Sequence, residues 1–139
     1  MNYRNPLPVA VALQPVRDND RRGLVVITRA IEPRSGGLAL PGGYIDHLED
    51  WRHAVVRELH EETGIEAARE DVRLADAMSA PDGYLLLFGL LPERAPQDLP
   101  PSVPTDETAG WHALYTPQDL AFPLHTAALR TWFAGGYTP

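Results

Sequence analysis

The stretch from Glu49 to Glu62 carries a long helical pattern in the middle of the chain. Trp51, Val55 and Leu59 are spaced four residues apart, so on an α-helix they form one apolar stripe. Gly64 lies just beyond, and glycine at such a position ends a helix because it readily adopts the left-handed conformation. The rest of the chain must therefore provide a surface that buries this stripe.

Segments with strand character surround this predicted helix. They are aliphatic or β-branched runs bounded by turn residues. The predicted strands are Pro8–Pro15, Gly23–Ala30 (second strand of a hairpin after the polar turn Arg17–Arg21), Leu38–Leu40, Val72–Met78, Tyr84–Leu91 and Thr108–Leu114, with a second helix over Pro123–Phe133. The order β-β-β-α-β-β-β-α predicts a mixed α/β or α+β fold, and a length of 139 residues suits one domain over residues 1–139.

Composition excludes several classes of protein. The chain has no cysteine, which rules out disulfides, thiolate metal sites and a cysteine nucleophile. A formal net charge of −7 argues against a general duplex nucleic-acid binder, whose affinity depends on basic contacts to phosphate. There is no run of about 18 apolar residues to span a membrane. The first residues lack the pattern of a signal peptide, so a cytoplasmic location is expected.

Three glutamates converge on one side of the predicted helix. Glu58, Glu61 and Glu62 are spaced i, i+3 and i+4, and Arg57 is the cation within the cluster, able to reach Glu61. A glutamate-rich helix face is usually only solvated, but clustered carboxylates also suit Mg²⁺ or Mn²⁺, which take oxygen ligands together with substrate phosphates. Water attack on a phosphoanhydride is the chemistry such a site would perform, with a spare carboxylate accepting the proton.

The complete pattern decides between these two interpretations. Gly43-x5-Glu49-x7-Arg57-Glu58-Leu59-x-Glu61-Glu62-x-Gly64-Ile65 resembles the Nudix box, residues 43–65, of the Nudix (MutT-type) hydrolase family at every specified position. Seven fixed residues and two aliphatic positions recur by chance in on the order of one chain in 10⁷. The preceding Pro41-Gly42-Gly43 is also typical of the family. The resemblance implies a Nudix-type α/β/α sandwich with a mixed β-sheet.

The resemblance also implies roles for the acidic residues of the box. Glu58 and Glu62 are the expected principal ligands of Mg²⁺ or Mn²⁺. Glu61 is either a third ligand or the base that activates water. Glu49 is an auxiliary ligand, directly or through water, and it can also fold back to orient Arg57.

Two further positions complete the expected site. Arg57 orients the glutamates through charge-assisted hydrogen bonds, so Arg57, Glu58 and Glu61 form the expected catalytic set. Gly43 allows a tight turn and a close backbone approach, where a carbonyl can join the metal ligands.

Candidate substrate-binding residues lie outside the box. Pro81 follows Ile65 by 16 residues, the spacing associated with the ADP-ribose-hydrolysing subgroup, although Pro81 also suits a plain turn before the Tyr84 strand. Tyr84 and Trp111 could stack on a base, as could Tyr44, while Trp in a short strand is more often a core residue.

Three other features leave alternatives open. Glu107 is either an additional metal ligand or base, or an exposed loop acid. Pro92–Pro104, with five prolines, is an irregular segment that could act as a lid or a dimer element. His125 is either a ligand contact or a packed residue. Many relatives are homodimers, so the resemblance also leaves a homodimer open.

The resulting hypothesis is a metal-dependent hydrolase of a nucleoside diphosphate linked to another moiety, with ADP-ribose or a related nucleotide sugar favoured. The alternative substrates are (d)NTPs or dinucleoside polyphosphates. A non-hydrolytic, nucleotide-sensing Nudix domain is a second class, but such domains usually have a degenerate box, and this box is complete. A metal-dependent isomerase is a third class, against which the absence of cysteine counts. In each hydrolase case the partner is a small-molecule nucleotide.

Overall fold

The computed structural model describes residues 4–138, so residues 1–3 and 139 of the predicted domain lie outside the described part. Its elements are β1 (Leu7–Leu13), β2 (Pro15–Asp18), β3 (Arg21–Arg29), β4 (Leu38–Ala39), β5 (Gly42–Tyr44), α1 (Trp51–Thr63), η1 (Arg69–Asp71), β6 (Arg73–Ser79), β7 (Tyr84–Leu90), η2 (Pro96–Asp98), β8 (Thr108–Leu114) and α2 (Pro123–Phe133). The predicted alternation of strands and helices is confirmed. In this part of the chain, no helix has the length and apolar character needed to cross a bilayer.

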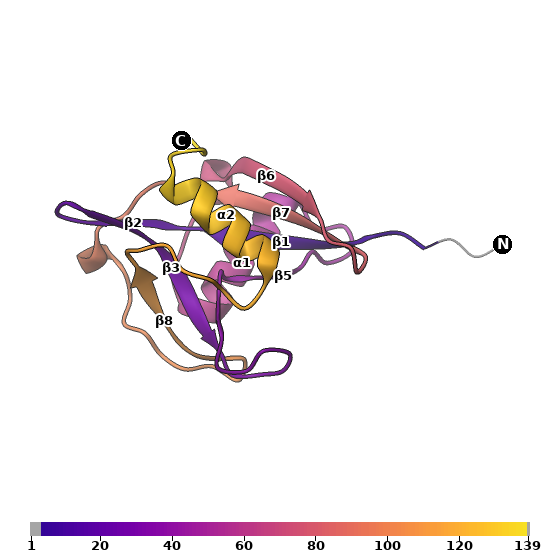
Figure 1. Ribbon diagram of the computed structural model, residues 1–139, viewed down its shortest axis with the longest axis horizontal. Coiled ribbons are helices and arrows are strands. Elements are labelled where there is room, and N and C mark those ends of the chain that lie inside the picture. Colours follow the sequence, from indigo (N-terminus) through magenta and orange to yellow (C-terminus); the bar gives the residue numbers. More distant parts are fainter. Residues whose placement is uncertain (1–3, 139) are drawn as a thin grey trace.

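The strands form two four-stranded sheets, one of them mixed as expected. In the first sheet, of order β5-β1-β7-β6, β1 runs parallel to β7 and the other pairs are antiparallel. In the second sheet, β3 pairs antiparallel with β2, β4 and β8. α1 and α2 cover opposite faces of the strands, which confirms the α/β/α sandwich (Figure 1).

The first predicted strand, Pro8–Pro15, is in fact divided between the two sheets. β1 belongs to the first sheet, whereas the hairpin partner of β3 is β2. The chain changes sheet at Gln14, a fully buried residue whose side-chain amide donates to the carbonyls of Pro15 (2.9 Å) and Pro92 (2.8 Å). An apolar run indicates burial, but it does not mark where the pairing partner changes.

Alternate residues of β1 face different helices, as the period of a strand requires. Val11 and Leu13 join the hydrophobic cluster under α2, while Ala10 and Ala12 join the cluster under α1. All four side chains are fully buried. The small alanines allow α1 to lie close to the sheet, which brings the glutamates of that helix next to the neighbouring strand β5.

α1 begins at Trp51, two residues later than predicted. The carboxylate of Asp50 caps the helix by accepting a hydrogen bond from a backbone N–H at 2.8 Å. Gly64, with φ of 78°, ends the helix as expected. The predicted apolar stripe is confirmed, with Val55 fully buried. The later start leaves Glu49 in the preceding loop, where it can fold back along the helix.

Gly89 is the position at which α1 and β7 approach most tightly. A Cβ at Gly89 would lie 2.9 Å from Val55 Cγ2 and 2.7 Å from Val72 Cγ1. We predict that Gly89→Ala lowers the free energy of unfolding by about 1–3 kcal/mol through overpacking, as measured by urea denaturation. Leu74→Ala, on the paired strand at an exposed position, is the control and should change stability little. A Gly89→Ala protein as stable as the parent would contradict this packing.

Candidate functional site

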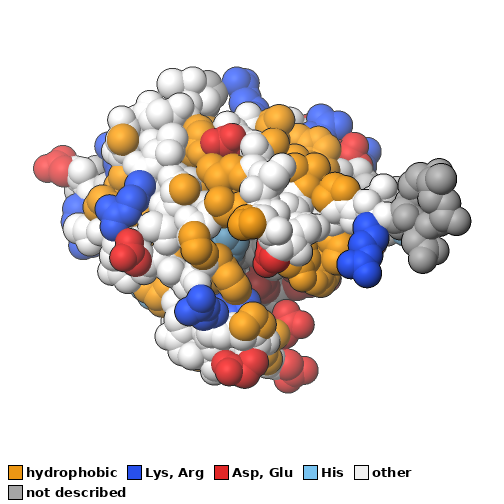
Figure 2. All heavy atoms as spheres, turned by 45° about the vertical axis from the view of Figure 1, so that its right-hand side comes forward, with side chains coloured by type: hydrophobic (Ala, Val, Ile, Leu, Met, Phe, Trp, Pro, Cys, Tyr) orange, Lys and Arg blue, Asp and Glu red, His pale blue; other side chains and the backbone are white. Residues whose placement is uncertain are grey.

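An open cavity of about 880 Å³ lies between the first sheet, α1 and the start of α2. Figure 2 shows a hollow bordered by hydrophobic side chains, with a histidine at its bottom. Most of the walls are apolar. The polar and charged side chains among the described lining residues are Arg29, Tyr44, Glu62, Asp82, Tyr84 and His125. This combination of an apolar chamber and few polar groups is typical of a small-molecule site.

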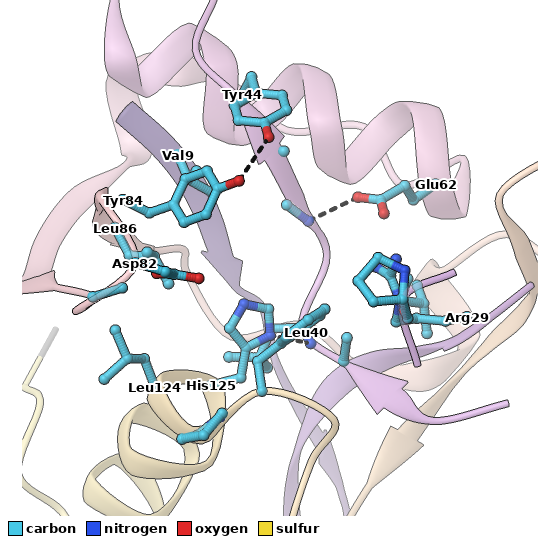
Figure 3. Close-up of a pocket in the computed structure, with 18 of the residues that line it drawn as sticks. Val9, Arg29, Leu40, Tyr44, Glu62, Asp82, Tyr84, Leu86, Leu124 and His125 are labelled. Carbon is cyan, nitrogen blue, oxygen red and sulfur yellow. Dashed lines mark hydrogen bonds between the residues drawn. The ribbon is translucent and has the colours of Figure 1, made fainter. Parts of the chain in front are cut away.

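Glu62 provides the carboxylate that α1 directs into this cavity (Figure 3). Its residue is only 6% exposed, and Oε2 accepts a hydrogen bond from the backbone N–H of Gly42 at 2.7 Å. Burial, reinforced by the negative charge of Glu58, raises the pKa of Glu62 to about 8. Glu62 therefore holds its negative charge at neutral pH only at a cost in free energy, which a nearby cation would remove.

Glu58 lies one turn earlier and packs directly against Gly43. A Cβ on Gly43 would lie 2.5 Å from Glu58 Oε1, so a glycine is required for this close approach. The tight turn expected at Gly43 is not found, because the residue belongs to the extended strand β5. Burial raises the pKa of Glu58, and the neighbouring Arg57 opposes the rise.

Arg57 is the centre of the acidic cluster, as predicted. Its Nε and Nη2 donate to the two oxygens of Glu49 at 2.7 and 2.9 Å, and Nη1 donates to Glu58 at 2.9 Å. The same Nη1 lies 3.3 Å from the carboxylate oxygens of Glu61, and Nη2 donates to the carbonyl of Tyr44 at 3.0 Å. These contacts, with Glu49 the strongest, raise the pKa of Arg57 further, so the group is a permanent cation.

Glu49 folds back from the loop before α1. Both of its oxygens bind Arg57, and the backbone N–H of Asp46 and the ring of His53 add further hydrogen bonds at 3.0 and 2.7 Å. The Arg57 bonds lower the pKa of Glu49 to about 2. The geometry matches a carboxylate that orients Arg57, which is one of the two roles expected for Glu49.

The remaining predicted acids are more exposed. The side chain of Glu61 is 55% exposed, and Glu107 is an exposed residue whose carbonyl accepts from the N–H of Ala30 at 2.9 Å. The negative charge of Glu107 contributes to the raised pKa values of both Glu58 and Glu62. Glu107 therefore lies close enough to these two glutamates to act on them electrostatically. Within residues 4–138, no group of three His, Asp or Glu side chains is arranged so that it could hold a metal ion.

Of the four predicted substrate-binding residues, the structure brings three to the cavity. Pro81, Tyr84 and Tyr44 line it, and the hydroxyl oxygens of the two tyrosines lie 3.4 Å apart (Figure 3). Trp111 does not line the cavity. Its ring packs against the hydrophobic cluster under α1, because β8 turns this side chain towards the helix. Trp111 is therefore a half-buried residue packed against the core, outside the lining of this cavity.

The cavity also contains Arg29, which was not among the predicted site residues, and His125, for which the sequence left a ligand contact or a packed position open. Arg29 ends β3, where its Nε donates to the carbonyl of Pro33 at 2.8 Å and its guanidinium lies 5.0 Å from the ring centroid of Phe122. His125 is buried in the first turn of α2. A cation at the end of an apolar strand was a signal for Arg29. The sequence could not decide between the two alternatives for His125, because only the tertiary fold brings α2 to the cavity.

The segment Pro92–Pro104 is irregular, as predicted, apart from the three-residue turn η2. It lies along β2, where Arg94 exchanges backbone hydrogen bonds with Pro15 and Arg17, and it contacts β8 through Ser102, whose Oγ accepts from a backbone N–H at 2.7 Å. None of its residues lines the cavity. The structure therefore does not support a lid over this cavity.

Comparison with known proteins identifies relatives of this chain. A family model described as NUDIX domain matches residues 6–134. An ADP-ribose pyrophosphatase of Methanocaldococcus jannaschii is 41% identical over 63 residues. That alignment covers 45% of this chain and 37% of the relative, so the chain matches well under half of the relative's length.

Solved structures show the same fold. The NUDIX domain of Shewanella oneidensis NrtR, in complex with ADP ribose, matches with a TM-score of 0.78 at 16% identity. The match covers 96% of this chain and 90% of that one. A bifunctional NMN adenylyltransferase/ADP ribose pyrophosphatase of Francisella tularensis, complexed with AMP and a Mn ion, gives a TM-score of 0.74 at 21% identity, covering 96% of this chain and 43% of that one. At these identities the likeness concerns the fold alone.

The raised pKa of Glu62 makes stability depend on pH. Its folded value of about 8 lies above the ordinary 4.5, so the folded state binds this proton more tightly and stability falls as pH rises through that interval. With a chelator present, we expect the free energy of unfolding to be about 2 kcal/mol lower at pH 8 than at pH 6. Glu62→Gln should flatten this profile, and Glu61→Gln, at an exposed position, should leave it unchanged. An equal slope in the parent and Glu62→Gln would contradict the pKa of Glu62.

Proposed function

The chain belongs to the NUDIX domain family, and from this premise we propose that it hydrolyses the phosphoanhydride of a nucleoside diphosphate linked to a second group, using Mg²⁺ or Mn²⁺. One observation carries the proposal. Glu62 is buried in the wall of a cavity that also contains the cationic Arg29, and the half-buried Glu58, one turn earlier on α1, adds a negative charge that raises the pKa of Glu62. Acids that repel each other beside a chamber for a small anion favour a site for a divalent cation and phosphates.

The donor set fits a hard divalent cation. Glu58 and Glu62 supply carboxylate oxygens, the type of ligand that Mg²⁺ and Mn²⁺ prefer. Their negative charges raise each other's free energy in a buried place, and Gly43 keeps the space beside Glu58 free of a side chain. We assign the principal ligands to Glu58 and Glu62, with Glu61 and Glu107 as candidates for further ligands. When bound, the cation would neutralise phosphate charge and lower the pKa of water.

The chain's own residues divide the remaining work. Arg29 would pair with phosphate oxygens inside the cavity. Arg57, held by Glu49, would keep Glu58 and Glu61 in place. Glu61, whose carboxylate is exposed and carries only the long contact to Arg57, is our candidate for the base that takes a proton from the attacking water. The water oxygen bonds to phosphorus while the bridging phosphorus–oxygen bond breaks, so ADP-ribose would give AMP and ribose 5-phosphate.

ADP-ribose or a related nucleotide sugar is the favoured substrate. The cavity of about 880 Å³ is near the upper end of the usual range for ligand pockets, which suits a substrate with two groups joined by a diphosphate. The Methanocaldococcus jannaschii relative is named an ADP-ribose pyrophosphatase, and the NrtR domain was solved with ADP ribose. Pro81, which the sequence associated with this subgroup, lines the cavity. The alternatives are (d)NTPs and dinucleoside polyphosphates.

A substrate panel tests the function. We expect phosphate release, in an assay coupled to a phosphatase, from ADP-ribose above NADH, diadenosine polyphosphates, coenzyme A and (d)NTPs, and only with Mg²⁺ or Mn²⁺. Glu62→Gln should lower kcat by at least about 100-fold, because it removes a proposed ligand but conserves shape. Glu70→Gln, a 76% exposed side chain on η1, is the matched control and should retain full activity.

Two results would contradict this proposal. Full activity of Glu62→Gln would show that the Glu62 carboxylate is not needed for the reaction. Absence of turnover across the panel with both metals, together with binding of ADP-ribose, would instead identify a domain that binds the nucleotide without hydrolysing it.

Arg29 provides a separate test of the phosphate-binding wall. Replacing the guanidinium by a neutral amide in Arg29→Gln removes charge-assisted hydrogen bonds to phosphate, so we expect KM to rise at least about tenfold. Arg130→Gln is the control, because Arg130 is an exposed cation that pairs with Asp119 on the surface. An unchanged KM for Arg29→Gln would exclude Arg29 from substrate binding.

A further inference from the structure

We propose that His125 determines substrate specificity by donating a hydrogen bond from Nε2 to an acceptor atom on the uncharged part of the substrate, a nucleobase or a sugar. The inference rests on the proposed function, because His125 lines the same cavity. It goes beyond that function by naming the group that selects the part of the substrate which does not react.

A backbone hydrogen bond fixes the proton on the His125 ring. β4 ends at Ala39, and the N–H of the next residue, Leu40, donates to Nδ1 of His125 at 3.1 Å. Leu40 is 1% exposed, and a buried backbone N–H requires such a partner. Since Nδ1 is the acceptor, the proton of the neutral ring is on Nε2, which is therefore a donor.

The donor faces the cavity. Figure 3 shows the second ring nitrogen of His125 pointing into the cavity, away from Leu40. In residues 4–138, the side-chain polar atoms that are sealed from solvent without a partner are Gln14 Oε1 and Trp111 Nε1, and Nε2 of His125 is not among them. It also forms no hydrogen bond with a described residue, so its N–H remains available to a ligand.

The ring is held rigidly and remains neutral. Phe122 packs edge-on against it with ring centroids 5.1 Å apart, and Phe88 does so at 6.3 Å. Burial, with a smaller contribution from the positive charge of Arg29, lowers the pKa of His125 to about 4. At neutral pH the cavity thus contains one fixed, uncharged N–H donor.

The surroundings of this donor determine what it can recognise. Leu40 and Leu124 lie next to His125 and Phe122 packs against its ring, so the immediate neighbours of Nε2 are apolar, and Arg29 acts on the ring only through the longer-range effect of its charge. A phosphate would instead meet Arg29 and the acidic end of the cavity at Glu62. An acceptor on a base or a sugar would pair with Nε2, whereas a group without an acceptor would leave the donor unsatisfied, which is a strong basis for discrimination.

Two substitutions separate this contact from the structural role of the ring. His125→Asn can still accept the N–H of Leu40 through Oδ1, but its shorter side chain removes the donor at the Nε2 position. His125→Gln extends an amide N–H towards that position. We expect His125→Asn to raise the KM for ADP-ribose about five- to twentyfold with kcat within about twofold and an unfolding temperature close to that of the parent. His125→Gln should recover part of the KM, and His60→Asn, at an exposed site on α1, should behave like the parent.

Calorimetric binding of AMP and of ribose 5-phosphate identifies the source of the acceptor. If the nucleoside half supplies it, His125→Asn weakens AMP binding and leaves ribose 5-phosphate unchanged; if the terminal ribose supplies it, ribose 5-phosphate binding weakens and AMP binding is unchanged. Unchanged KM and unchanged binding of both probes in His125→Asn would overturn the proposal. So would a KM defect in His125→Asn that His125→Gln does not reduce. Wild-type protein that binds AMP without any turnover would refute the proposed hydrolase alone, while protein that binds neither probe nor ADP-ribose would refute both.

Discussion

The Arg57 guanidinium joins the parts of the chain on which the candidate site depends. It binds Glu49 in the loop before α1, Glu58 and Glu61 on the helix, and the carbonyl of Tyr44 at the end of β5. A planar group with five donors suits this purpose, because it can bind several acceptors in fixed directions at once. Arg57 therefore holds α1 in position against β5 and orients two carboxylates of α1, those of Glu58 and Glu61. The glutamates can stay close together only because Arg57 offsets their repulsion.

Glu62 is the acid that this cation does not reach. It is the most enclosed acid of the cluster, and within residues 4–138 its carboxylate accepts a hydrogen bond from the backbone N–H of Gly42 alone. Its neighbour Glu58 shares its charge with Arg57, so the two acids differ in environment although they lie one turn apart. A buried carboxylate without a cationic partner lowers the stability of the folded state. Glu62 is therefore the clearest physical reason to propose a function for this wall of the cavity.

Local patterns explain which parts could be predicted from the sequence. The helix, its apolar stripe and the convergence of its glutamates all follow from spacing within a single element, and the structure agrees with each. The division of Pro8–Pro15 between two sheets could not be predicted, because the buried run of β1 continues through Gln14 into the first two residues of β2. The place of Trp111 depended on which way β8 faces, and His125 became a cavity residue only through the docking of α2. Spacing predicts neighbours along an element, but not contacts between elements.

The parallel pairing of β1 with β7 has a consequence for the order in which the molecule is completed. Leu7 pairs with Tyr84, so the central pair of strands closes a loop that contains the whole Nudix box. During synthesis the glutamate helix is made before β7 and α2, and domains form as units once their partners are present. The proposed metal ligands are thus made before the strands and helix that complete the cavity. The contact between β1 and β7 joins residues far apart in the sequence, and long-range contacts of this kind slow folding.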